Sequence, residues 1–123
     1  PVLAKFTAVD WACVDPAEMG LGPVYATRDL LKKQRLRMED IDYWEINEAF
    51  AVQTMAVARL LKIPNERLNI WGGAIALGHP IGASGARILV TLLSAMADRR
   101  ACHGVASLCI GGGMGIAVIV KRE

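Results

Sequence analysis

The sequence predicts an α/β fold in which a mixed β-sheet carries helices on both faces. Short β-rich segments open and close the chain, and three segments between them place apolar residues at helical spacing. The elements follow the order β-α-β-α-α-β-β, which favours a layered α/β architecture. Because the chain has 123 residues, 54% of them hydrophobic and 21% charged, we expect one domain over residues 1–123 around one hydrophobic core.

The first strand and the first helix are predicted at the start of the chain. Residues 2–9 are β-rich and fit a strand. The prolines and glycines of residues 15–23 indicate a loop, and Pro23 suits the first turn of a helix, where its missing N–H is no loss. We expect this helix at about residues 24–34. Its inward residues are Leu30 and Leu31, and its outward residues are Arg28, Lys32 and Lys33.

A second strand and a second helix are predicted in the middle of the chain. Residues 41–46 follow a turn and alternate in a way that favours a strand. Asn47 stands at the end of this strand, where it suits the N-cap of a helix at residues 48–61, and Glu48 favours the first turn of that helix. Four apolar residues of the helix share one stripe, namely Val52, Met55, Ala56 and Leu60.

The last part of the chain is rich in glycine. Ten of the twelve glycines lie between Gly72 and Gly115, so this part must contain tight turns or close backbone approaches. A helix at about residues 82–99 carries apolar residues at a period of 3.6. Residues 105–110 and 115–120 read as strands, and because only glycines and one methionine separate them, we expect them to pair as antiparallel neighbours.

Composition excludes several classes of function. The formal net charge is only +2 and the basic residues form no track, which argues against nucleic-acid binding. No run approaches the roughly 20 apolar residues of a membrane helix, so we expect no membrane span. Three cysteines without paired spacing predict a reducing compartment, the cytoplasm or another, with the organelle left open. The abrupt start at Pro1 suggests a fragment or a processed piece.

His79 is the first candidate functional residue. A lone histidine is more often a surface or core residue than a catalyst, but Gly78 and Pro80 hold this one in a loop of fixed shape. The helix that follows directs its N-terminal N–H groups toward this loop, and their positive potential disfavours protonation of the imidazole. We therefore expect a neutral ring that can donate from one nitrogen or accept a proton.

Cys109 is the second candidate. Cys13 and Cys102 are interpreted as small core residues. Cys109 differs because three glycines follow it at the end of a strand, where bare N–H groups favour a thiolate and can donate to an oxyanion. On the residues alone, a core role and a functional role both stay open for Cys109, and a plain N-cap role stays open for Asn47.

Other motifs are missing or incomplete. The glycine run of residues 111–115 lacks the Gly-Lys-Ser/Thr of a phosphate loop, and a strand rather than a helix follows it. Cys102 and His103 are too isolated for a zinc site, so we predict no metal. The chain has no Gly-x-Ser-x-Gly elbow.

Three segments resemble the C-terminal signatures of thiolases. They are Asn-Glu-Ala-Phe-Ala at residues 47–51, the Gly-His-Pro segment of residues 72–85, and Cys-Ile-Gly-Gly-Gly-Met-Gly at residues 109–115. They occur in the order of the family and at its approximate spacing. Residues 14–23 resemble a fourth and less specific segment, so that the resemblance covers essentially the whole chain.

The resemblance implies a role for each matching residue. His79 would activate the nucleophilic cysteine of the other half of the enzyme and help to hold a thioester oxyanion. Cys109 would be the acid–base cysteine, which takes the α-proton of an acetyl thioester and returns a proton to the departing CoA thiolate. Asn47 would position a water that joins His79 in one oxyanion hole, and the N–H of Gly111 would belong to a second.

The resemblance also implies a substrate channel. Met19 and Phe50 would line it around the pantetheine and the acyl group. Trp71 departs from the pattern, because the family usually has a small polar residue before Gly72. The nucleophilic cysteine and most of the CoA-binding region would belong to an N-terminal half that lies outside this sequence.

The resemblance implies a five-stranded mixed sheet with helices on both faces, one half of the duplicated thiolase core. The activity would be acyl transfer between CoA thioesters, either condensation of acetyl-CoA or thiolysis of 3-ketoacyl-CoA, with the acyl-CoA as substrate and no cofactor. The expected partner is the N-terminal thiolase half, and the full-length enzyme is expected to be a homo-oligomer. The chain alone should be inactive.

Two alternatives stay open. The chain could act as a non-catalytic assembly module, a subunit or fragment that docks an N-terminal partner without turnover. It could also be a nucleotide-binding α/β module that uses its glycine-rich turns. Binding of ATP or NAD would favour the second alternative, and complex formation without turnover would favour the first.

Overall fold

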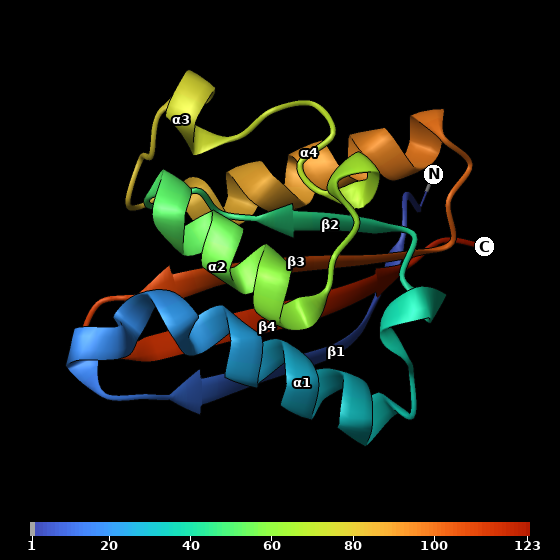
Figure 1. Cartoon of the computed structure of the whole chain (residues 1–123). Coiled ribbons are helices and arrows are strands. Elements are labelled where there is room, and N and C mark those ends of the chain that lie inside the picture. Colours follow the sequence, from blue (N-terminus) through green and yellow to red (C-terminus); the bar gives the residue numbers. More distant parts are fainter. Residues whose placement is uncertain (1) are drawn as a thin grey trace.

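The structure, a computed structural model, describes residues 2–123 and contains one mixed sheet of four strands in the order β1-β4-β3-β2 (Figure 1). The strands are β1 (Lys5–Cys13), β2 (Tyr43–Ile46), β3 (His103–Ile110) and β4 (Met114–Lys121). β2 and β3 are parallel, whereas β4 is antiparallel to both of its neighbours. The hairpin of β3 and β4 confirms the antiparallel pair expected from the glycine-separated segments.

The expectation of a fifth strand is wrong for the described residues. The segment after α2 (Ala51–Leu61) reaches the free edge of β2, but pairs there through one isolated parallel bridge, between Leu68 and Trp44. The next residue, Asn69, has a φ of 44° and turns the chain away. Its side-chain amide bonds both backbone groups of Ile46, donating to the carbonyl and accepting from the N–H, each at 2.9 Å. Asn69 thus satisfies the backbone N–H and carbonyl of Ile46, with which a fifth strand would otherwise pair.

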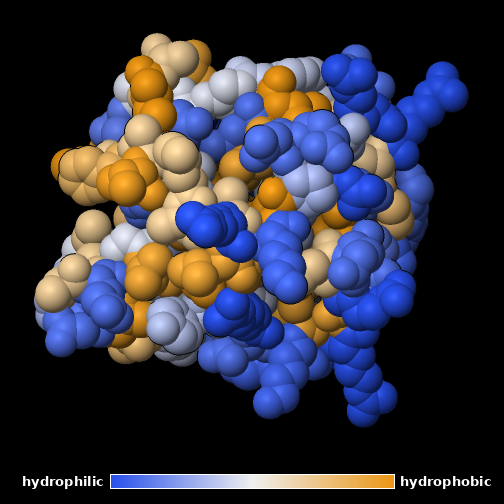
Figure 2. Space-filling view, viewed as in Figure 1, coloured by the Kyte–Doolittle hydropathy of each residue, from blue (hydrophilic) through white to orange (hydrophobic). Residues whose placement is uncertain are grey.

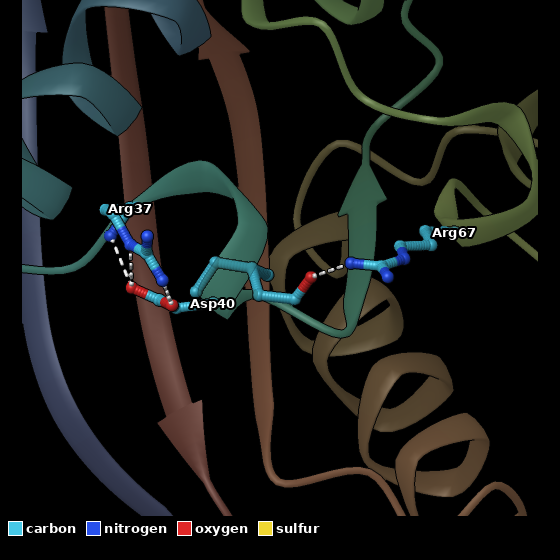
Figure 3. Close-up of polar contacts among 4 residues, drawn as sticks. Arg37, Asp40 and Arg67 are labelled. Carbon is cyan, nitrogen blue, oxygen red and sulfur yellow. Dashed lines mark hydrogen bonds and ion pairs between the residues drawn. The ribbon is translucent and has the colours of Figure 1, made fainter.

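Two arginines make hydrogen bonds that hold the segments before and beside the start of β2. Arg67 donates to the carbonyl of Ile41 at 3.2 Å, which fastens the segment after α2 beside the strand (Figure 3). Arg37 donates three times to Asp40 across one short turn, from its backbone N–H at 2.8 Å, from Nη2 at 2.9 Å and from Nε at 3.4 Å (Figure 3). The guanidinium of Arg37 accordingly lowers the pKa of the Asp40 carboxyl. These contacts hold the entry of β2, whose other end carries Asn47.

Helices cover both faces of the sheet, as expected. α1 (Gly22–Gln34) and α2 lie on one face and α4 (Ser84–Asp98) lies on the other (Figure 1). Consecutive residues of β3 show the division, because Val105 packs in the core cluster of α1 and α2 while Ala106 packs in the cluster of α4. The largest buried side chain, Trp44 of β2, belongs to the α1/α2 core.

The predicted faces of α1 and α4 are confirmed. Pro23 lies in the first turn of α1, Leu30 and Leu31 are buried, and the basic residues are exposed. Arg35 ends the helix in a left-handed conformation. In α4, Ile88, Leu92 and Met96 are buried, while Leu89 and Leu93 are half-buried against the same cluster. The helical spacing of the apolar residues, together with Pro23 in α1, therefore sufficed to predict the buried faces of these two helices.

Two expectations about α2 are wrong. The helix begins at Ala51, after an N-cap at Phe50 that makes no side-chain cap bond, so Asn47 is not its N-cap. The apolar stripe also faces outward, with Val52 74% and Met55 70% exposed (Figure 2). The buried face consists of Gln53, Thr54, Val57, Ala58 and Leu61. A helix with apolar residues on two sides can bury either, and here the side with two polar residues faces inward.

The interpretation of two cysteines as core residues is also wrong. Cys13 and Cys102 are exposed, and only Cys109 among the three free cysteines is buried. Cys13 ends the edge strand β1, and the Cys102 thiol donates to the carbonyl of Arg122 at 3.3 Å. The reducing compartment expected from these cysteines stays a prediction. No helix in residues 2–123 is long and apolar enough to cross a bilayer.

The face of the sheet that carries α4 is only half covered. α4 packs on β2 and β3, and Val118 and Val120 of β4 join its cluster, whereas the same face of β1 leaves apolar side chains in solvent. Phe6 and Trp11 of β1 are each 67% exposed, and Val9 between them is also exposed. In the antiparallel register these three residues pair with Val120, Ile116 and Val118 of β4. Phe6, Val9 and Trp11, which form the β1 patch, thus lie on the same face of the sheet as α4.

Candidate functional site

The carboxyl ends of the parallel strands β2 and β3 carry two of the candidate residues. The N–H of Asn47 donates to the carbonyl of Ser107 at 2.9 Å, which extends the ladder beyond the last residue of β2. Cys109 follows Ser107 by two residues on the same strand. Because ligands of open α/β sheets bind outside the carboxyl ends of the strands, this edge is the natural place for a site.

Asn47 is held inside the protein rather than at a helix start. It is fully buried, and its Oδ1 atom has no hydrogen-bond partner among the described residues. Its backbone carbonyl lies 3.5 Å from the hydroxyl of Thr54 on α2. The surroundings of this buried amide fix its orientation, so its Nδ2 atom can donate a hydrogen bond in one direction only.

His79 lies in an exposed loop that a glycine shapes. Gly78 adopts a φ of 91°, which a residue with a side chain rarely adopts. His79 Nδ1 lies 2.5 Å from Ser84 Oγ, and Ser84 Oγ donates to the carbonyl of Pro80 at 3.0 Å. The single hydroxyl proton of Ser84 goes to Pro80, so Ser84 accepts from Nδ1–H of the histidine. A neutral His79 therefore carries its lone pair on Nε2.

The structure brings His79 and Asn47 together. Asn47 Nδ2 lies 3.4 Å from His79 Nε2, a long hydrogen bond in which the amide donates to the ring. The chain of contacts thus runs from Ser84, the first residue of α4, through the imidazole to the end of β2. Since α4 and β2 pack together, two elements of the core fix a histidine that itself lies in solvent.

Glu48 holds the loop that leads to His79, and the expectation that it lies in the first turn of α2 is wrong, because α2 begins at Ala51. Its carboxylate accepts from the backbone N–H of Ile75 at 3.0 Å and from Asn69 Nδ2 at 3.2 Å. A side chain at Gly73 would collide with it, because a Cβ there would lie 2.5 Å from the Glu48 carboxyl carbon. Glu48 therefore sits at the start of the short helix α3 (Ala74–Leu77).

The surroundings of Cys109 favour its protonated thiol in this domain. The residue is buried, and burial raises the pKa of its thiol, while its backbone lowers the pKa less. The thiolate expected from the neighbouring glycines is thus disfavoured. A buried neutral thiol is suited to donate a proton, and it becomes a base only after it has done so.

The glycines after Cys109 form the turn between β3 and β4. Gly112 and Gly113 have φ values of 91° and 88°, so the turn requires glycine there. The carbonyl of Gly113 accepts from Val14 N–H at 2.7 Å. Gly111 is exposed, and a side chain built on it would meet nothing within 4 Å. The backbone at Gly111 is therefore open to the approach of a ligand.

Met19 and Phe50 flank this end of the domain. Met19 belongs to the 3-10 helix η1 (Pro16–Leu21), is half-buried, and precedes Gly20, which packs closely on Gln53 of α2. Phe50 stands before α2 and is 61% exposed. Their expected role as lining of a substrate channel stays a prediction. Trp71, which departs from the family pattern, is exposed, and nothing in the structure explains it.

A groove of about 1140 Å³ lies elsewhere, on the outer side of α2 (Figure 2). Met55, Leu60 and Ile75 line it, whereas none of His79, Asn47 and Cys109 does. Its size alone does not make it the reactive site, because it gathers apolar side chains without converging acid–base groups. The candidate acid–base residues lie instead at the carboxyl ends of β2 and β3.

Three residues near the site were missed in the sequence. Ser84 lies in a segment singled out there, but its bond to His79 depends on how the loop folds back on α4. Glu45 is a buried charged residue of β2, and Arg87 of α4 is half-buried with its guanidinium nitrogens out of solvent. A glutamate inside a strand with otherwise apolar neighbours, and an arginine one helical turn after Ser84, are signals that could have indicated a polar layer between the two elements.

Comparison with known proteins identifies the family. The family model described as the thiolase C-terminal domain matches residues 1–122. The acetyl-CoA acetyltransferase of Pseudomonas aeruginosa is 55% identical over 123 residues, and a probable acetyl-CoA acetyltransferase of Escherichia coli is 51% identical over the same length. Each alignment covers 100% of this chain and 31% of the relative.

Solved structures agree in fold. Human mitochondrial 3-ketoacyl-CoA thiolase in complex with CoA superposes with a TM-score of 0.97 at 46% identity, over 100% of this chain and 31% of that one. The acetyl-CoA acetyltransferase of Bacillus anthracis superposes with a TM-score of 0.96 at 45% identity, over 98% of this chain and 31% of that one. The chain thus spans about a third of the length of these relatives. It belongs to the thiolase family of acyltransferases and corresponds to their C-terminal domain.

Proposed function

We propose that this domain supplies the proton-transfer and oxyanion groups for acyl transfer between CoA thioesters, in a site completed by an N-terminal thiolase part. The observation that carries the proposal is the chain of contacts from Ser84 through His79 to Asn47, at the strand ends that also present the Cys109 thiol. The names of the relatives, acetyl-CoA acetyltransferase and 3-ketoacyl-CoA thiolase, support the substrate class.

His79 has the tautomer that nucleophile activation needs. Its Nδ1–H is engaged by Ser84, so Nε2 can take the proton of a cysteine thiol supplied by the N-terminal part. The sulfur then attacks the thioester carbonyl, and the new Nε2–H can donate to the oxygen on which negative charge develops. Asn47 Nδ2, which is directed toward the same nitrogen, supplies a second donor there, directly or through a water.

Cys109 serves both the departing CoA sulfur and the attacking enolate carbon. As a neutral thiol it gives its proton to the CoA thiolate that leaves when the acyl-enzyme forms. The resulting Cys109 thiolate then takes the α-proton of the second acetyl thioester, and the enolate attacks the acyl-enzyme. In thiolysis the same proton transfers run in reverse. The N–H of Gly111, whose backbone is exposed, would donate to the enolate oxygen.

The N-terminal part would dock on the half-covered face of the sheet. A sheet face of this width has room for a second helix beside α4, and the β1 patch leaves Phe6, Val9 and Trp11 exposed there. Exposed apolar patches of this kind mark interaction sites. In the full-length enzyme, further copies of the chain would form a homo-oligomer.

Reconstitution tests the proposal. The chain is co-purified with the remainder of the Escherichia coli relative, which is 51% identical to it where they align, and thiolysis of acetoacetyl-CoA is followed. We expect activity that falls by at least about 100-fold in Cys109→Ala and in His79→Ala. Cys102→Ala is the matched control, because that cysteine is exposed and lies just before β3, at the end of the strand opposite to Cys109.

The two sequence-based alternatives predict other results. A stable complex without turnover would contradict the catalytic role and favour an assembly module. Saturable binding of ATP or NAD by the chain, without thiolysis on reconstitution, would favour the nucleotide-binding module. Equal activity in Cys109→Ala and in the unaltered chain would remove Cys109 from the mechanism.

A further inference from the structure

β2 presents two polar side chains toward α4. Trp44 and Ile46 pack in the core of α1 and α2, and Tyr43 packs in the α4 cluster. Because side chains alternate along a strand, Glu45 and Asn47 share the α4 side. Glu45 is only 1% exposed and Asn47 is fully buried. Two consecutive polar residues of this face therefore lie out of solvent under the loop of His79.

α4 presents a matching pair. Ser84 bonds His79, and Arg87 follows it by three residues, so the two side chains lie on neighbouring positions of the helix surface. The nitrogens Nε, Nη1 and Nη2 of Arg87 are all buried. β2 and α4 therefore face each other through two polar rungs, Ser84–His79–Asn47 and Arg87–Glu45.

The second rung lacks the hydrogen bonds of the first. Glu45 Oε2, Asn47 Oδ1 and the three guanidinium nitrogens of Arg87 have no partner among the described residues. Buried polar atoms are paired in nearly all native structures, directly or through ordered water. The three groups are complementary, since a guanidinium only donates and the two oxygens accept.

The charge of Arg87 acts on the carboxyl of Glu45. Burial raises the pKa of the Glu45 carboxyl to about 8, the positive charge of Arg87 lowers it, and the neighbouring Glu48 raises it further. The guanidinium thus acts on Glu45 across a gap that no direct ion pair closes. A water between the two groups would satisfy both.

We propose that Arg87 and Glu45 are positioning residues for catalysis, which fix the orientation of the Asn47 amide through water-bridged contacts. Arg87 can only donate, so the amide turns Oδ1 toward it and leaves Nδ2 for His79. The opposite orientation would set Oδ1 against the lone pair of His79 Nε2 and Nδ2 against the guanidinium. Glu45 in turn holds Arg87 in place. The inference rests on the proposed function, because it names what orients a group of that site.

A double-mutant cycle in the reconstituted enzyme tests this coupling. Arg87→Met keeps the length of the side chain and removes its donors, and we expect kcat to fall about 10-fold or more with little change in KM. In the Asn47→Ala background, Arg87→Met should cause no further loss, since its effect passes through the amide. Arg87→Lys should restore part of the activity. Arg99→Met, the same change at the exposed end of α4, is the control and should leave kcat unchanged.

Side-chain NMR of the chain gives a second measurement that needs no activity. Arg87→Met should shift the Asn47 amide signals and the Nε2 signal of His79, whereas Arg99→Met should shift neither. Equal kcat losses from Arg87→Met in both backgrounds, or Asn47 signals that do not move, would overturn the inference. If the unaltered enzyme shows no thiolysis, the proposed function fails while the NMR result still decides the inference. Should Arg87→Met not fold, Arg87→Lys is compared with Arg99→Lys in the same way.

Discussion

The two faces of the sheet differ in how completely they are covered. On one face, α1 and α2 bury an apolar core that includes Trp44, Val105 and Ile119, each at most 1% exposed. On the other face, α4 covers β2 and β3 and leaves the β1 patch in solvent. The polar rungs, with His79 and Asn47, lie at the end of this half-covered face. Cys109 shares the other side of β3 with Val105, at the same end of the sheet.

The difference separates stability from function within one small domain. The covered face resembles the core of any independent domain, so changes there should unfold the chain. The half-covered face combines buried polar groups with exposed aromatic ones, which is typical of a surface that meets a partner. Changes there should alter association and catalysis more than folding.

The largest expected effect concerns the covered face. Trp44→Ala removes the largest fully buried side chain of the α1/α2 core, and we expect a loss of about 3–5 kcal/mol in the free energy of unfolding. Urea denaturation followed by circular dichroism measures it. Trp11→Ala, the same change at an exposed position of the other face, should stay within about 0.5 kcal/mol of the unaltered chain. Similar losses in both variants would abolish the distinction between the faces.

The second effect concerns the half-covered face, where the substitution should alter association and not stability. Trp11→Ala should weaken association with the N-terminal thiolase part by about 2 kcal/mol or more, which is roughly 30-fold in Kd, because exposed tryptophans are common interface anchors. Isothermal titration of the two parts measures it. Tyr25→Ala is the control, since Tyr25 is an exposed aromatic residue of α1. An unchanged Kd for Trp11→Ala would move the docking surface away from β1.

The last effect concerns the polar rungs and is the smallest when the change in unfolding free energy is taken for one pH unit. The pKa of Glu45 rises from 4.5 to about 8 on folding, so between these values the folded state binds more protons than the unfolded state. Stability therefore falls as the pH rises from 5 to 8, by at most about 1.4 kcal/mol for each pH unit. Glu45→Gln should remove this slope. The difference in unfolding free energy between the two proteins, measured from pH 5 to 8, checks it, and parallel curves would contradict a buried ionisable Glu45.

Much of the fold was predictable because local signals agreed with the tertiary structure. Pro23 and the spacing of Leu30 and Leu31 defined α1, and the glycines after Cys109 defined the β3–β4 hairpin. α2 was misjudged in its buried face, since Thr54 finds a polar partner in Gln53 at 3.2 Å and so can be buried. Sequence spacing cannot show which of two apolar sides meets the core.

The candidate site was predictable in its residues but not in its geometry. His79, Asn47 and Cys109 lie in recognisable segments, yet the burial that raises the pKa of Cys109 comes from tertiary packing. Asn47 looked like an N-cap because it precedes a helix, whereas its backbone continues the ladder of β2 and β3. The fifth strand failed for a similar reason, because the side chain of Asn69 takes its place at the edge of β2.

A crystal structure of the reconstituted complex with acetyl-CoA would test the central claim most directly. The account predicts that the thioester lies at the carboxyl ends of β2 and β3, with its carbonyl oxygen in hydrogen-bond reach of His79 Nε2. The sulfur of Cys109 should lie about 3.5 Å from the reacting carbon. A thioester bound in the groove over α2, or His79 and Cys109 directed to separate cavities, would contradict it.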